Sequence, residues 1–266
     1  MNSQSVSGPA KPQGERVWTF WATLLWGFAT FIALGIAQIA TSVAILSWRS
    51  PSFDMSELVR LSSDGVAVAL AALSVAPATL AVVALAVRLA RADFAEYLAL
   101  RSFGWRDLLL GLGSIAVYVA AVDLVTLLLG RSIEPPFVLD TLQSAAAAGA
   151  LPLFIGAVAL AAPLSEELMV RGFLFRGFAA SSLGPVGAIV LASALWASLH
   201  LQYDAFFIGE VFGVGLILGW MRWRSGSTWL AVILHAAYNL IAVAQGLWLL
   251  WSAAHPAVAG FGAPLL

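Results

Sequence analysis

Long apolar runs, separated by short polar segments, dominate the hydrophobic pattern of this chain. A helix that crosses a membrane needs roughly 20 apolar residues, and on this criterion the pattern predicts spans near residues 17–47, 65–87, 108–129, 148–175, 185–201, 205–221 and 227–250. The fifth and sixth runs are short, and only the turn Gln202–Tyr203–Asp204 separates them, so they predict a tight hairpin. We therefore expect an all-α fold, a polytopic transmembrane helical bundle of about seven spans.

The two ends of the chain lack this apolar pattern. Residues 1–16 are rich in Ser, Gln, Pro and Gly, which predicts a disordered cytoplasmic tail, and residues 252–266 predict a short C-terminal tail. The segment between them, residues 17–251, is expected to form a single transmembrane helical domain. Its first apolar run is longer than the roughly 7–15-residue core of a signal peptide, so we expect a retained anchor.

The composition supports a membrane protein and excludes several classes of function. Apolar residues make up 61% of the 266 residues and charged residues 10%, whereas soluble domains have roughly 45–50% and 25%. The lipid bilayer is therefore the first expected partner. The net charge of −1 and the lack of a basic block argue against a nucleic-acid partner. The absence of cysteine excludes disulfides, thiolate metal ligands and a cysteine nucleophile.

The distribution of lysine and arginine predicts the orientation, because these residues gather in cytoplasmic loops. With a cytoplasmic N-terminus, ten of the thirteen basic residues fall on the cytoplasmic side, and the three on the opposite side are Arg49, Arg60 and Arg131. Without Arg171, which lies inside a predicted span, nine against three remain. We expect a multi-pass protein of the cell membrane, either a plasma membrane or a bacterial inner membrane, with its N-terminus in the cytoplasm.

Three of the predicted spans contain titratable or amide side chains within otherwise apolar sequence. A charged group at the centre of a bilayer costs roughly 2.5–3.5 kcal/mol, so such residues indicate a function. With a rise of about 1.5 Å per residue, all of them fall in the middle third of a ~30 Å hydrocarbon core and could meet there. They are Glu166, Glu167 and Arg171, then His200, then His235 and Asn239.

The two adjacent glutamates predict a division of roles. Neighbouring side chains point about 100° apart on a helix, whereas Glu167 and Arg171 are four residues apart and share a face. We expect Arg171 to neutralise Glu167 as a structural pair and Glu166 to face a cavity as a general base. The alternative is a buried ion-pair network that only holds helices together. Asp123 and Glu210 are further intramembrane charges that could line a water path or cap Arg171.

The histidine segments also allow two interpretations. His200 ends an apolar run, and a lone membrane histidine can be either a hydrogen-bonding group between helices or a catalyst. His235 and Asn239 are four residues apart and share one helical face. That face would offer donors for an oxyanion or, through the histidine, a metal ligand. The alternative is again a polar contact between helices.

Three motifs carry a resemblance to a known family. They read Glu166-Glu167-Leu-Met-Val-Arg171, Trp196-Ala-Ser-Leu-His200 and His235-Ala-Ala-Tyr-Asn239. The chain thereby resembles the CPBP family, the CAAX-processing and bacteriocin-processing intramembrane proteases that include the Ras-converting endopeptidase. The family pattern is E-E-x-x-x-R, F-x-x-x-H and H-x-x-x-N/D, so Trp196 replaces a phenylalanine and preserves its bulk. The resemblance covers about residues 150–245, the expected catalytic core.

The resemblance implies an intramembrane endopeptidase that cleaves a membrane-associated protein or peptide. Glu166 and His200 would activate a water, and His235 and Asn239 would stabilise the oxyanion, with Glu167 and Arg171 in support. The family has been described both as metal-free glutamic proteases and as metalloproteases. Glu166, His200 and His235 could form a three-ligand zinc site, so the expected cofactor is either none or zinc. We favour the metal-free mechanism.

Two other functions compete with proteolysis. A transporter would also explain buried charges, but it predicts inverted repeats or broken helices in matching halves, and neither is evident in the sequence. A non-catalytic membrane scaffold could keep the same fold and the same motifs. The sequence does not define the substrate, and in particular it carries no sign of whether a prenylated tail is cleaved.

Overall fold

The computed structural model describes residues 17–49 and 55–255, and all of its regular elements are helical. The predicted tail at residues 1–16 lies outside these residues, as does most of the predicted C-terminal tail at 252–266. The elements in chain order are α1 (Phe20–Arg49), α2 (Met55–Leu61), α3 (Gly65–Leu89), α4 (Phe94–Tyr97), α5 (Trp105–Leu128), α6 (Pro136–Ala147), α7 (Leu151–Gly156), η1 (Ala157–Ala161), α8 (Ala162–Glu167), η2 (Leu168–Leu174), α9 (Phe175–Ala179), α10 (Gly184–Ala197), α11 (Ala205–Ser225) and α12 (Thr228–Ala254).

Within the described part of the chain, six helices are long and apolar enough to cross a membrane. They are α1, α3, α5, the continuous helix Leu151–Ala179 formed by α7 to α9, α11 and α12. The prediction of a polytopic helical bundle is confirmed, and each predicted run corresponds to one helix. The short helices α2, α4 and α6 lie in connections that the apolar pattern had left unassigned.

The fifth apolar run differs from a full span. Helix α10 has 14 residues and is therefore about 21 Å long, less than the ~30 Å hydrocarbon core. It ends at Ala197, and the connection 198–204 leads back into α11 as the second half of the predicted hairpin. His200 thus lies on a turn inside the bundle, where backbone and side chain are both accessible to a cavity.

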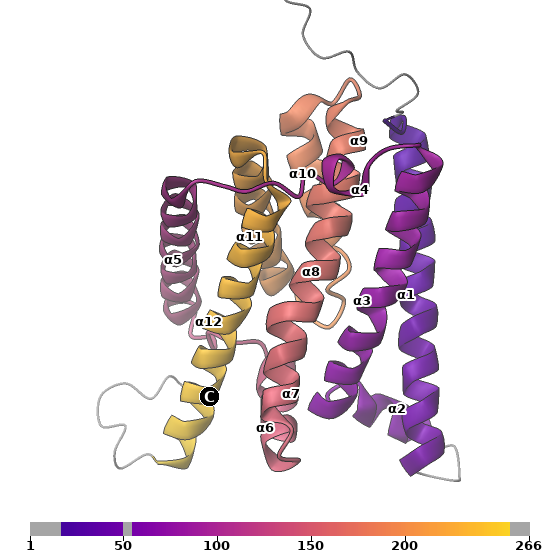
Figure 1. The fold of residues 1–266 in the computed structure, drawn as a ribbon. Helices are drawn as coiled ribbons and strands as arrows, with labels where there is room; N and C mark the ends of the chain where they lie inside the picture. The colour runs from indigo at the N-terminus through magenta and orange to yellow at the C-terminus, as the bar shows by residue number, and fades with distance from the viewer. Residues whose placement is uncertain (1–16, 50–54, 256–266) are drawn as a thin grey trace, which may run out of the picture.

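The helices surround the composite helix α7–α9 at the centre of the bundle (Figure 1). Helices α1 and α3 lie side by side on one flank, and α5 lies at the opposite edge. Helix α2 sits at the end of the bundle where α1 finishes, and α4 and the start of α10 sit at the other end. We call these the α2 end and the α4 end.

The described basic residues divide between these two ends. Arg88 in the last turn of α3 and Arg91 just after that helix lie at the α4 end, and Arg101, Arg106, Arg176, Arg222 and Arg224 also belong to elements or connections that start or finish there. Arg49, Arg60 and Arg131 belong to elements that finish at or toward the α2 end. The end at which most of the described arginines gather is therefore the α4 end.

A tight turn fixes how α12 returns from the α4 end. Gly226 ends α11 with φ of 69°, a left-handed conformation that glycine adopts without strain. Ser227 then caps α12 by accepting a hydrogen bond from Leu230 N–H. Its hydroxyl also donates to the carbonyl of Arg101 at 2.5 Å, and Thr228 donates to the carbonyl of Leu98 at 2.5 Å. These bonds fix the start of the helix that carries His235 and Asn239.

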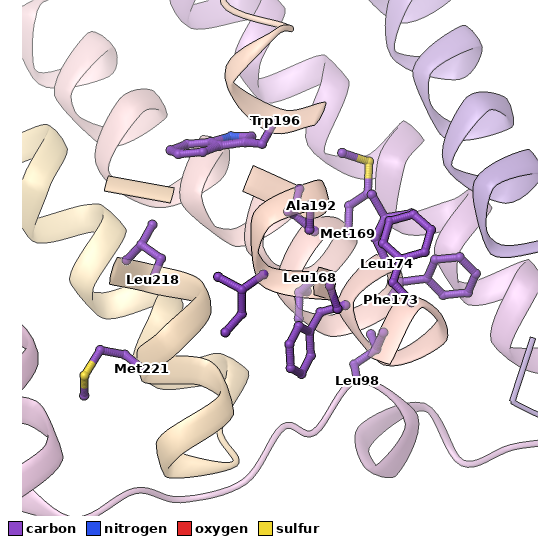
Figure 2. Close-up of a cluster of buried hydrophobic side chains, with 14 of the residues drawn as sticks. Leu98, Leu168, Met169, Phe173, Leu174, Ala192, Trp196, Leu218 and Met221 are labelled. Atoms are coloured by element: carbon purple, nitrogen blue, oxygen red, sulfur yellow. The ribbon is translucent and has the colours of Figure 1, made fainter. Parts of the chain in front are cut away.

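A buried apolar cluster holds the catalytic-core helices together (Figure 2). Leu98 from the α4–α5 connection, Phe173 from η2 and Leu218 from α11 are each at most 1% exposed. Figure 2 shows Trp196 at the edge of this cluster. Its side chain is 2% exposed, and the guanidinium of Arg171 lies over its ring.

Candidate active site

The turn that carries the two glutamates is bounded by π-helical segments, η1 before it and η2 after it. Single π turns are commonly found at functional sites. In η1 the N–H of Ala162 bonds the carbonyl of Ala157, and the next residue, Pro163, has no N–H to offer Val158. The free carbonyl of Val158 instead accepts a hydrogen bond from Nδ2 of Asn239 at 2.7 Å. The missing backbone hydrogen bond at the Val158 carbonyl in the central helix thereby orients Asn239 on α12.

Glu167 and Arg171 form a fully buried ion pair, with Nη1 and Oε1 2.7 Å apart and side chains 1% or less exposed. The contact expected from the four-residue spacing is therefore present. Arg171 also donates from Nη2 to the carbonyl of Gly215 at 3.1 Å, and a Cβ on Gly215 would approach Nη2 to 3.3 Å. Its remaining contact is the ring of Trp196, 4.5 Å from the guanidinium carbon. Every bond donated by Arg171 therefore serves to hold α8, η2 and α11 together.

Glu167 has a second partner that the sequence did not indicate. Its Oε1 also accepts a hydrogen bond from Nδ1 of His235 at 2.9 Å, so it orients the imidazole as well as the guanidinium. The suggestion that Asp123 or Glu210 caps Arg171 is wrong. Asp123 instead accepts a hydrogen bond from Gln245, and Glu210 accepts one from Tyr238.

Glu166 faces away from this ion pair. Its Oε2 accepts a hydrogen bond from the indole Nε1–H of Trp196 at 2.6 Å, and its side chain is half-buried. It lines a cavity of about 480 Å³ together with His200, His235 and Asn239. The structure thus brings together all four side chains to which the sequence assigned chemistry, and it separates Glu166 from the structural pair.

Trp196 contacts each of the titratable groups of the site. Its ring meets the rings of His200 and His235 edge-to-face, with centroids 5.2 and 5.1 Å apart, in addition to its bond to Glu166. From the sequence motif, Trp196 was expected only to be an aromatic group of suitable bulk. The one signal available was the exchange of phenylalanine for tryptophan, because this exchange adds an N–H donor beside a carboxylate.

The hydrogen bonds of the two histidines define which nitrogen is free. Nδ1 of His200 lies 3.1 Å from the carbonyl of Trp196, which can only accept, so Nδ1 carries the proton. The same argument applies to Nδ1 of His235 against the carboxylate of Glu167. In both rings Nε2 has no partner within the described residues and remains available to a ligand. Figure 1 places the segments that carry them, the end of α10 and the upper half of α12, against the same central helix.

The arrangement does not fit a metal site as it stands. No group of three or more His, Asp or Glu side chains in residues 17–49 and 55–255 is close enough to hold a metal ion. Glu166, His200 and His235 line one cavity, but Oε2 of Glu166 is turned to the indole of Trp196. Zinc bound by protein needs three ligands within about 2.0–2.3 Å of one point. We therefore derive no step through a metal.

The cavity extends from the site toward the α2 end of the bundle. Beyond Glu166 it is lined by Gln38 and Ser42 of α1, by Ser62 after α2 and by Thr141 of α6. These polar groups can hold water along a path through otherwise apolar helices. The wall supplied by α3 consists mostly of alanine and valine, which leaves space for a chain lying along the helix.

A comparison with known protein families finds a match for the segment that carries these residues. Residues 148–241 match the family model described as Rce1-like, type II CAAX prenyl endopeptidase Rce1-like. No curated protein and no solved structure matched the chain. The match includes all six predicted site residues, from Glu166 to Asn239, and the six spanning helices make the chain a multi-pass membrane protein. The match to the Rce1-like family model agrees with the CPBP resemblance of the three motifs, all of which lie within residues 148–241.

Proposed function

We propose that the protein is a metal-free intramembrane endopeptidase in which Glu166 is the general base. The observation that supports this most strongly is the shared cavity, where Glu166 lies with both histidines and Asn239 around space for water. The family match supports peptidase activity in general, and the geometry supports the individual roles. The active residues lie inside the bundle, so the substrate must reach them within the membrane.

The roles of Glu166 and His200 in hydrolysis follow from which of their side-chain atoms are not already hydrogen-bonded. Oε2 of Glu166 is held by Trp196, which leaves Oε1 to take a proton from water, while Nε2 of His200 orients that water by accepting its other hydrogen. The water oxygen attacks the peptide carbonyl, and the carbonyl oxygen becomes an oxyanion. Glu166 then passes the proton to the leaving nitrogen as the C–N bond breaks, which restores the carboxylate.

His235 and Asn239 stabilise the oxyanion. Because Nδ1–H of His235 is bound to Glu167, the ring can donate to the oxyanion only from Nε2, and only when both ring nitrogens carry a proton. Asn239 uses one N–H on Val158 and keeps a second for the oxyanion. Donors fixed before the reaction are worth about 10²–10³ in rate each.

The substrate class follows from the surroundings of the site. A helical segment hides its carbonyls in hydrogen bonds, so the scissile bond has to be extended or locally unwound. The substrates are therefore membrane-associated proteins or peptides with a flexible segment near the bilayer. We also propose that the chain resides in the cell membrane with its N-terminus in the cytoplasm, because basic residues gather at the α4 end.

The test is cleavage of a quenched-fluorescence library of apolar peptides by the full-length protein in lipid nanodiscs. Wild-type protein should cleave, and Glu166→Gln should lower kcat/KM by about 10²–10⁴-fold without lowering the melting temperature. Retained cleavage in Glu166→Gln would overturn the assignment of the base. Wild-type protein that cleaves nothing, also when it is purified without chelator, would favour the scaffold.

The same assay addresses the metal. The proposed mechanism predicts that cleavage persists after dialysis against a chelator and that activity does not follow the zinc content of the preparation. Loss of activity on chelation, with recovery on adding Zn²⁺, would replace the metal-free mechanism by a zinc-dependent one. A transporter would instead show substrate-dependent charge movement in proteoliposomes and no cleavage.

A further inference from the structure

A second, smaller cavity adjoins the candidate active site. It has a volume of about 70 Å³, room for roughly five water-sized groups. His200, His235 and Asn239 line it as well as the larger cavity, so the two are continuous at the catalytic residues. Glu134 and Glu210 line only the smaller one, and the proposed mechanism uses neither of them.

Glu134 is the unusual residue of this cavity. It lies in the connection between α5 and α6, is only 4% exposed, and its carboxyl has no hydrogen-bond or ion-pair partner among the described residues. Burial, followed by the nearby charges of Glu210 and Asp123, raises the pKa of Glu134 to about 9. A buried polar group without a partner destabilises the fold, so its retention here points to a ligand.

Two further carboxyl groups lie near Glu134, and among the described residues no lysine or arginine lines the cavity. Glu210 accepts a hydrogen bond from the hydroxyl of Tyr238 at 2.9 Å, and Asp123 accepts one from the amide of Gln245 at 2.6 Å. The nearest basic residue along the chain, Arg131, is paired with Asp204 instead. Within the described part of the chain, these carboxyl groups thus have no lysine or arginine as a counter-charge.

The walls of the cavity match an amphipathic side chain. They are mostly apolar, formed by Ile133, Pro135, Val138, Phe207, Val211 and Ala242, and the carboxyl groups interrupt them. A lysine or arginine buries its methylene stem against such walls and places its charged head on a carboxylate. The ring of Tyr203, which also lines the cavity and stacks on His200, offers an aromatic face to the same cation.

We propose that Glu134 and Glu210 form a subsite for a lysine or arginine side chain of the substrate, close to the scissile bond. The inference rests on the proposed peptidase function, because the subsite opens onto the catalytic histidines. It gives the substrate class a chemical feature that the motifs do not carry: a basic residue within an otherwise apolar segment. The cation would exchange for the proton that Glu134 carries when the subsite is empty.

The first experiment compares cleavage of apolar peptides that carry lysine, arginine, glutamine or norleucine at each position around the cut. Wild-type protein should prefer the basic peptides by about 10- to 100-fold in kcat/KM at one position, the value of a charge-assisted hydrogen bond. Glu134→Gln, which keeps the shape, should reduce this preference to near unity. The control is Asp140→Asn, an exposed carboxylate on α6 that lines neither cavity. An equal rate for lysine and norleucine peptides in wild type, or a preference that survives Glu134→Gln, would overturn the proposal.

The second experiment measures binding, so that failure of the peptidase function can be told apart from failure of the subsite. Labelled lysine and norleucine peptides are titrated into Glu166→Gln protein with Glu134 intact or replaced. Tighter binding of the lysine peptide, lost in the double variant Glu134→Gln/Glu166→Gln, supports the subsite even if no peptide is cleaved. Equal binding of both peptides overturns it even if both are cleaved.

The pH dependence of the preference for lysine distinguishes a subsite from a purely structural role of Glu134. Glu134 is protonated at neutral pH, so binding a cation releases a proton, and the preference for lysine over norleucine should increase between pH ~7 and pH ~9. The ratio removes titrations that affect both peptides equally. The titratable groups that face Glu134 are Glu210 on α11, Asp123 on α5, His235 and Tyr238 on α12, and His200 and Tyr203 in the connection 198–204. A ratio independent of pH would contradict the exchange.

Discussion

The indole N–H of Trp196 donates a hydrogen bond to Oε2 of Glu166 at 2.6 Å, although the family pattern has phenylalanine at this position. The bond fixes one oxygen of the proposed base and leaves the other for water. Replacement by the family residue, Trp196→Phe, keeps an aromatic ring near His200 and His235 and removes the N–H donor together with part of the indole bulk. We expect kcat to fall by about 10- to 100-fold, because a hydrogen bond to a charged group contributes about 1.5–3 kcal/mol, while KM changes little.

The control for this substitution is Trp248→Phe, on α12, where the indole is 48% exposed. It should leave both kcat and the melting temperature unchanged. If Trp196→Phe retains the wild-type kcat, the indole N–H does not orient Glu166, and Trp196 acts only through its bulk.

Glu167 should affect stability more than any other residue of the site. In Glu167→Gln the guanidinium of Arg171, 1% exposed, loses its counter-charge, and one amide oxygen cannot serve both Arg171 and His235 as well as the carboxylate does. Breaking a buried ion pair costs about 3–5 kcal/mol. We expect a clear drop in melting temperature in detergent, together with loss of cleavage.

An exposed ion pair in the same chain provides the matched control. Glu57 and Arg60 on α2 are 2.8 Å apart, with side chains 37% and 73% exposed. Glu57→Gln should change stability by less than about 0.5 kcal/mol. A Glu167→Gln protein as stable as Glu57→Gln would mean that Arg171 finds other compensation.

The sequence predicted most of the fold because bilayer length and side-chain periodicity constrain it strongly. Each of the seven apolar runs corresponds to one helix, and the i, i+4 spacing was enough to pair Glu167 with Arg171. The depth argument was also sufficient to bring Glu166, His200 and His235 to one cavity. The apolar pattern could not show that α10 stops short of a full span. The turn that follows α10 lies inside the bundle and also contains apolar residues, so the pattern does not mark the end of the helix.

Features that depend on contacts between distant segments were not predictable. Glu134 lies in a connection that the apolar pattern left unassigned, and it is buried beside a cavity that residues of α6, α11 and α12 also line. The bond from His235 to Glu167 joins residues 68 positions apart. Neither spacing nor composition encodes such a pair, since it depends on the rotation of α12 against the central helix.

The direction of the larger cavity predicts the side from which the site is reached. It runs from Glu166 to Ser62 at the α2 end, which the proposed orientation places on the side opposite the cytoplasm. The chain has no cysteine, so an introduced cysteine is the only thiol that a labelling reagent can modify. Ser62→Cys should react with a membrane-impermeant maleimide on intact cells.

The control position lies at the other end of the bundle. Ser182, exposed in the turn between α9 and α10, should react as Ser182→Cys only after the cells are permeabilised. The opposite labelling pattern would reverse the proposed orientation and place the mouth of the cavity in the cytoplasm. It would leave the geometry of the site unchanged.

The bond between Asn239 and the carbonyl of Val158 makes it possible to separate the structural from the catalytic role of the amide. Asn239→Ala should lower stability by about 1–3 kcal/mol, because a buried carbonyl loses its partner, and should lower kcat by about 10²–10³-fold through loss of an oxyanion donor. Both effects are expected together in the single variant.

A second substitution in the central helix should recover only one of them. Pro163→Ala supplies the backbone N–H that the Val158 carbonyl lacks, so the double variant Asn239→Ala/Pro163→Ala should regain most of the melting temperature of the wild type. Its kcat should remain low, because no donor has been returned to the oxyanion. Recovery of cleavage along with stability would show that Asn239 only anchors η1, and the oxyanion would then depend on His235 alone. The single variant Pro163→Ala, measured in parallel, separates any effect of straightening the helix from the effect of the restored bond.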